Sequence, residues 1–119
     1  MVRLRLEQRG LRLIDMNKLV KKSNIKNLDA MIELVAELFG LSTKEILSPI
    51  QIQDAVEARA VLYVYLHQQG YSRRLICRAF SKDYGTITNG INMLSVYLDS
   101  NTILQTRFQK FIKGMQKYD

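Results

Sequence analysis

The chain has 119 residues, of which 47% are apolar and 24% are charged, so it is long enough for one small domain with a hydrophobic core. Its one cysteine, Cys77, excludes an intramolecular disulfide and the four-ligand zinc patterns, and is typical of a protein of the reducing cytoplasm. The formal net charge of +7 favours a polyanionic partner, with nucleic acid ahead of an anionic membrane.

Most of the excess positive charge lies in residues 1–26, which hold eight basic and two acidic residues. No long apolar stretch accompanies these charges, so we expect neither a secretory signal nor a membrane span. The alternation of apolar and basic residues is compatible with a strand and with a poorly ordered arm. A membrane-surface anchor is a weaker alternative. We therefore divide the chain into a basic N-terminal arm, residues 1–26, and a folded domain, residues 27–119.

The first half of the domain is predicted to be helical. Apolar residues repeat at helical spacing over residues 28–39, where Asn27 can cap the start and Gly40 can end the helix. Residues 42–45 (Ser-Thr-Lys-Glu) have the pattern of a capping box and open a short helix through Leu47. A third helix is predicted over residues 54–69, and its few charges indicate burial on most sides.

Three further helices are predicted after Gly70. Ser72 can cap the first of them, whose apolar face ends at Phe80. A break over residues 81–85 precedes a helix that ends at Leu98, and a polar cluster at residues 99–101 precedes the last one. The predicted fold class is all-α, with five or six helices around one core and a helix-turn-helix.

Catalysis finds little support in this sequence. The one histidine, His67, is interpreted as a surface or partly packed residue, and Cys77 as a small core residue. Residues 85–90 resemble a phosphate-binding loop but lack its lysine and a preceding strand. We expect no enzyme activity, no metal and no cofactor.

The segment of residues 72–98 predicts a DNA-binding helix-turn-helix. Its second helix starts with polar side chains that can meet base edges, and its apolar residues are spaced to face a core. Three arginines on the first helix lie where such a helix crosses the phosphate backbone. The candidate DNA-binding residues from this pattern are Ser72, Arg73, Arg74, Arg78, Lys82, Tyr84, Thr86, Thr88 and Asn89.

Four sequence runs, Val35–Leu41, Glu45–Ser48, Ser72–Phe80 and Lys82–Ile87, resemble the C-terminal DNA-binding domain of the bacterial replication initiator DnaA. The resemblance covers about residues 28–115 and implies an all-helical, Trp-repressor-like helix-turn-helix. It also implies DNA contacts for three matching residues, Arg59, Asp83 and Thr86.

The chain departs from this family at three points. Tyr84 and Gly85 stand where the family signature has a base-reading histidine and threonine, and residues 49–54 lack the basic residues of the family's loop. At 119 residues the chain has no room for the initiator's ATPase domain, so we expect a stand-alone relative.

The resulting hypothesis is a cytoplasmic, bacterial module that binds double-stranded DNA and regulates replication or transcription. The alternative is a protein-interaction module that keeps the fold, forms a homodimer or heterodimer, and exposes an apolar patch around Tyr63, Tyr65 and Tyr97.

Overall fold

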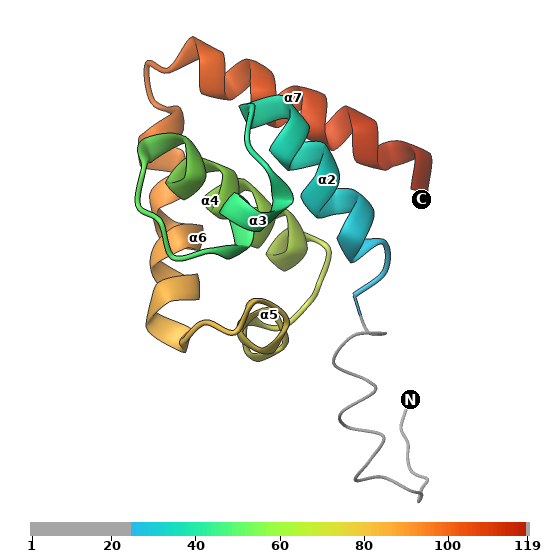
Figure 1. Cartoon of the computed structure of the whole chain (residues 1–119). Helices are drawn as coiled ribbons and strands as arrows, with labels where there is room; N and C mark the ends of the chain where they lie inside the picture. Colours follow the sequence, from blue (N-terminus) through green and yellow to red (C-terminus); the bar gives the residue numbers. More distant parts are fainter. Residues whose placement is uncertain (1–24, 119) are drawn as a thin grey trace, which may run out of the picture.

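The computed structural model describes residues 25–118, and all regular structure in this range is helical. In Figure 1, α7 runs across one end of the molecule with α2 beside it, α4 lies in the middle, and α5 lies at the opposite end. Within this range, the prediction of an all-α fold with five or six helices is confirmed. The elements are α2 Leu28–Phe39, α3 Thr43–Leu47, α4 Gln53–Gln68, α5 Arg73–Phe80, α6 Tyr84–Leu98, α7 Thr102–Met115 and the 3-10 turn η1 Gln116–Tyr118.

The predicted N-terminal arm falls almost entirely on residues 1–24, which lie outside the described residues. Its last two residues, Ile25 and Lys26, contact the helical domain. Ile25 is buried in the core, and the backbone N–H of Lys26 donates a hydrogen bond to the Tyr71 hydroxyl at 3.1 Å. Packing of the domain therefore begins at least two residues before the predicted boundary.

The ends of α2 illustrate one wrong and one confirmed prediction. Asn27 precedes the helix but does not cap it through its side chain, because its backbone is left-handed with φ 61°. Gly40 ends the helix as predicted, with φ 68°, a conformation that costs glycine little because it has no Cβ. The predicted capping box of α3 is confirmed: the Ser42 hydroxyl accepts from Glu45 N–H at 3.0 Å, and the Glu45 carboxylate accepts from Ser42 N–H at 2.8 Å.

Helix α4 forms the centre of the core and is buried on most sides, as predicted. Its buried set includes two charged residues, Glu57 and Arg59, as well as aliphatic and tyrosine side chains. Helix α6 packs closely against α4 at Gly90, where an added Cβ would lie 2.7 Å from the ring of Tyr63. The ring of Tyr63 in turn meets Phe80 of α5 edge to face, at 5.3 Å between centroids. Helix α4 is therefore the support on which both α5 and α6 rest.

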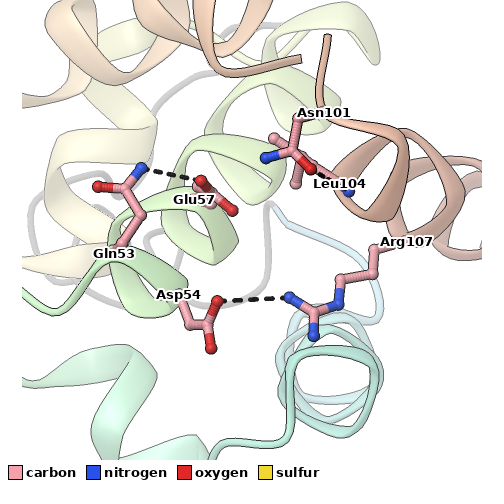
Figure 2. A network of polar contacts seen from close by, with 6 residues as sticks. All are labelled: Gln53, Asp54, Glu57, Asn101, Leu104 and Arg107. Carbon is pink, nitrogen blue, oxygen red and sulfur yellow. Dashed lines mark hydrogen bonds and ion pairs between the residues drawn. The ribbon is translucent and has the colours of Figure 1, made fainter. Parts of the chain in front are cut away.

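One ion pair attaches the start of α4 to α7, and local hydrogen bonds lie near it in both helices (Figure 2). Asp54 forms an ion pair with Arg107 at 3.4 Å, and the same guanidinium lies 4.8 Å from the ring centroid of Phe39. Within α4, the Gln53 amide donates to the Glu57 carboxylate at 2.8 Å. The Asn101 side chain caps α7, as the predicted capping cluster requires, by accepting from Leu104 N–H at 3.0 Å. These contacts fix the end of the molecule opposite α5.

None of the helices within residues 25–118 combines the length and the apolar character that crossing a membrane requires.

Candidate nucleic-acid interface

Helices α5 and α6 are joined by residues 81–83, a connection of the length found in helix-turn-helix pairs. Ser72 caps α5 as predicted, because its hydroxyl accepts from Leu75 N–H at 3.1 Å. Ser81 ends α5 with a left-handed backbone, φ 55°. Asp83 caps α6 by accepting from Thr86 N–H at 2.7 Å. The predicted break over residues 81–85 is therefore two residues too long, since Tyr84 and Gly85 already belong to α6.

The two helices cross steeply, since Figure 1 shows α5 end-on while α6 runs along the page. Their inner faces are apolar: Ile76 and Phe80 of α5 and Ile87 and Leu94 of α6 are buried. This packing against α4 leaves the opposite face of α6 open to solvent. The pair thus presents a supported outer surface at one end of the molecule.

Most of the predicted DNA-binding residues lie on this outer surface. The side chains of Arg73, Lys82 and Thr88 are half-buried, and a further seven residues are exposed. The exposed residues are Ser72, Arg74, Arg78, Asp83, Tyr84, Thr86 and Asn89.

One part of the surface is a shallow bay lined by Arg74, Cys77, Arg78 and Tyr84. Arg74 and Arg78 are one helical turn apart on α5, so their guanidinium groups share one side of that helix. Tyr84, at the start of α6, is 54% exposed, which is high for an aromatic side chain. The bay therefore combines two exposed cations with a large solvent-facing ring.

Arg73 has a different position from the other two arginines of α5. Its guanidinium donates to the Thr88 hydroxyl at 3.3 Å, so it links α5 to the second turn of α6. Both side chains are half-buried. The structure therefore separates the predicted arginine cluster into one linking residue and two exposed residues.

A narrow cleft lies between the start of α6 and the loop that precedes α4, residues 48–52 (the 48–52 loop). Gln51 of the loop and Arg59 of α4 line one side, and Lys82, Thr86 and Asn89 line the other. The polar start of α6 thus has a second element beside it, far from it in sequence.

Arg59 lies apart from the exposed residues, because it is 7% exposed and its donors face the protein. Its guanidinium donates to four backbone carbonyls, those of Glu45 at 3.2 Å, Ile46 at 2.8 Å, Ser48 at 2.6 Å and Ile50 at 2.7 Å. Burial lowers the pKa of Arg59, an effect that the neighbouring Tyr63 opposes. The DNA contact implied for Arg59 by the family resemblance has little exposed surface through which to act, so we place Arg59 outside the candidate interface.

Two further groups have shifted pKa values. Hydrogen bonds from the side chain and backbone of Thr86 lower the pKa of Asp83, so its carboxylate stays ionised as the cap of α6. Burial raises the pKa of Tyr63 to about 12; Arg59 opposes this shift and Cys77 adds to it. Tyr63 therefore stays neutral beneath the interface at physiological pH.

The prediction of an exposed apolar patch, made for a protein-interaction module, is wrong for two of its three residues. Tyr63 and Tyr65 are 3% and 7% exposed, and Tyr97 is half-buried. Large apolar side chains that are exposed lie at other positions, and Val96 and Ile103 are the most exposed of them at 58% and 65%.

The residues predicted to be chemically inert occupy ordinary positions. His67 is exposed near the end of α4, as predicted, and the free thiol of Cys77 is half-buried rather than part of the core. Across residues 25–118, no group of three or more His, Cys, Asp or Glu side chains is placed to hold a metal ion.

Sequence reasoning missed two features of this site. The capping role of Asp83 had a usable signal, since Asp at an N-cap position is typical of a helix start. The carbonyl contacts of Arg59 had none, because backbone acceptors 9 to 14 residues away leave no side-chain pattern.

Comparisons with known proteins add no assignment: no family model matches the chain, and no curated protein matches it.

Proposed function

We propose that α5 and α6 form a helix-turn-helix that binds double-stranded DNA in the cytoplasm. The observation that carries this proposal is the exposed polar start of α6, which stands beside two exposed arginines of α5 on a buried apolar support. In a helix-turn-helix the second helix enters the major groove and the first crosses the phosphate backbone. Helix α6 is then the recognition helix.

The phosphate contacts in this proposal fall to Arg74 and Arg78. They are exposed and unpaired among the described residues, and no acidic side chain lines their bay. Guanidinium groups suit phosphate oxygens because they offer paired donors in a fixed plane. Lys82, half-buried at the start of α6, supplies a third cation on the same surface.

The base contacts fall to Thr86 and Asn89, which are exposed on the first turns of α6. An asparagine amide can pair with adenine, and a threonine hydroxyl can donate or accept at several bases. Tyr84 adds an aromatic ring that can pack against sugars or a thymine methyl group. Asp83 contributes by capping α6 rather than by contacting anionic DNA.

The resemblance to the DnaA C-terminal domain supports the same function, in the regulation of replication or transcription. Because Tyr84 and Gly85 replace two base-reading residues, the preferred sequence differs from the family's. Substituting Gly85→Thr tests this idea, since it restores a family residue at a position where an added Cβ meets only the Asp83 carboxylate, at 3.8 Å. We expect this variant to change the sequences selected from a random duplex pool.

The direct test is fluorescence polarisation with labelled random and genomic duplexes at about 50 mM salt, where electrostatic binding is strong. We expect saturable binding that weakens steeply as salt is raised. Arg74→Ala should weaken binding to all sequences and reduce the slope of log affinity against log salt by about 1. Lys113→Ala is the matched control, because it removes one exposed positive charge on α7, which lies at the opposite end of the molecule (Figure 1).

The absence of binding to any duplex at this salt would rule out the proposal. Equal losses in Arg74→Ala and Lys113→Ala would rule out the assigned surface and leave only nonspecific attraction between a basic protein and DNA.

Cys77 offers an independent test of where the duplex lies. It is the one cysteine of the chain, it is half-buried, and it lines the same bay as Arg74 and Arg78. A duplex on this surface should slow the reaction of the thiol with a maleimide. Unchanged labelling of the DNA-bound protein would place the DNA elsewhere.

A further inference from the structure

Arg59 joins three consecutive segments of the chain, α3, the 48–52 loop and α4. It extends from α4 and donates to two carbonyls of α3, those of Glu45 and Ile46, and to two carbonyls of the 48–52 loop, those of Ser48 and Ile50. One side chain thus uses four of its five N–H groups on backbone oxygens. The planar fork of a guanidinium makes this possible, whereas a lysine ammonium carries only three donors at one point.

Three of the four acceptors, the carbonyls of Ile46, Ser48 and Ile50, receive no other hydrogen bond within residues 25–118, whereas the Glu45 carbonyl also accepts from the N–H and the hydroxyl of Ser48, at 3.3 and 2.9 Å. The last carbonyls of any helix lack partners within that helix, and α3 has only five residues. A cation at the C-terminal end of α3 also matches the negative end of the helix dipole. In the loop, the carbonyls of Ser48 and Ile50 belong to no helix. Arg59 therefore ties the end of α3 and the loop to α4.

The loop held by Arg59 lies next to the candidate interface. Gln51 lines the cleft whose opposite side is formed by Lys82, Thr86 and Asn89. A duplex seated on the start of α6 would lie beside Gln51. The loop, residues 48–52, holds no lysine or arginine, so attraction to phosphates cannot order it during binding.

We propose that Arg59 is a positioning residue, which holds the 48–52 loop as a fixed wall beside the recognition helix. The inference rests on the proposed DNA-binding function. A loop that is ordered before binding spares the complex the entropic cost of ordering it. Arg59 thus strengthens duplex binding from within the protein, without a phosphate contact of its own.

Hydrogen exchange on the free protein tests the clamp without DNA. Arg59→Lys keeps the positive charge but loses the planar fork, and far-UV circular dichroism verifies that the helices remain. We expect the backbone amides of Ile50 and Gln51 to exchange about tenfold faster or more, because charge-assisted hydrogen bonds to the loop are lost, while α7 exchanges as before. Unchanged exchange in the 48–52 loop would overturn the clamp.

Salt titrations of duplex binding separate positioning from direct contact. We expect Arg59→Lys and Arg59→Gln both to lose about tenfold in affinity, with the wild-type slope of log affinity against log salt. A direct phosphate contact predicts otherwise: the lysine would keep the affinity and the glutamine would lower the slope by about 1, as in Arg74→Ala. Either of these results would overturn the positioning role.

Two outcomes remain to be distinguished. If both Arg59 variants unfold, Gln51→Gly provides the test, because it frees the loop at an exposed position, and the same loss of affinity at constant slope is expected. If the wild-type protein binds no duplex, the proposed function fails, while the exchange measurement still decides whether Arg59 orders the loop.

Discussion

Helices α4 and α6 are neighbours of nearly equal length, 16 and 15 residues, yet their surroundings are opposite. Helix α4 is buried on most sides, whereas α6 buries Ile87 and Leu94 and exposes Thr86 and Asn89. A helix that is buried all round can only support the fold, while a helix that packs along one face keeps the other free to vary. The difference indicates that substitutions on α6 should affect stability or binding according to the face they lie on.

The largest effect is expected on the inner face of α6. Ile87→Ala removes a side chain with no solvent exposure and should destabilise the protein by about 3 kcal/mol, through lost burial and the cavity left behind. Urea unfolding followed by circular dichroism measures this loss. The exposed Asn89→Ala, two residues away, should change stability by about 0.5 kcal/mol or less. Similar losses for both would show that α6 is not packed by one face.

The second-largest loss of stability is expected where α6 contacts α4. In Gly90→Ala the added Cβ would lie 2.7 Å from the Tyr63 ring, which is 3% exposed and held by Phe80. We expect a net loss of about 1–2 kcal/mol, because the overpacking outweighs the higher helix propensity of alanine. Urea unfolding again reports the change. A more stable variant would mean that α6 can move away from α4 at little cost.

Gly85→Ala is the matched comparison on the same helix. Here the added Cβ meets only the Asp83 carboxylate, at 3.8 Å, so no overpacking opposes the gain in helix propensity. We expect stabilisation of about 0.5 kcal/mol, seen as a higher urea midpoint. A loss of stability at Gly85 would show that α6 does not begin at Tyr84 in solution.

The helix ends that the sequence predicts well are those at which a side chain acts on its own neighbours. The capping box of Ser42 and Glu45, the cap at Ser72 and the end of α2 at Gly40 each depend on residues within a few positions. Such capping patterns involve only neighbouring residues, so they can be recognised without knowing the rest of the fold. Asn27 shows where they fail: its side chain is suited to capping, but its backbone takes a left-handed turn instead.

The sequence predicted the exposed residues of the candidate site but not the buried contacts that hold its helices in place. Exposed Arg74 and Thr86 could be read from the polar side of a helical repeat. The four carbonyls around Arg59 and the close approach of Gly90 to Tyr63 depend on how α4 meets α3 and α6. Such tertiary contacts join distant residues, and no periodicity in a single sequence reports them.

The smallest effect is expected from pH at the cap of α6, since the Asp83 carboxylate is exposed and solvent screens its interactions. The hydrogen bonds from Thr86 lower its pKa below the ordinary 3.8. A carboxylate with a depressed folded-state pKa stabilises the protein above its unfolded-state pKa, and this contribution disappears as pH falls through the folded-state value. Asp83→Asn keeps a capping oxygen but cannot titrate.

The gap in urea midpoint between wild-type protein and Asp83→Asn should therefore be widest near neutral pH and should narrow as the pH falls below about 4. Asp99→Asn, at the other end of α6, is the matched control, because the Asp99 carboxylate accepts no hydrogen bond from any residue in the described range. A gap that stays constant for Asp83 as the pH falls would mean that the Thr86 hydrogen bonds do not favour the ionised form. The cap at Asp83 would then stabilise the start of α6 equally in its ionised and neutral forms.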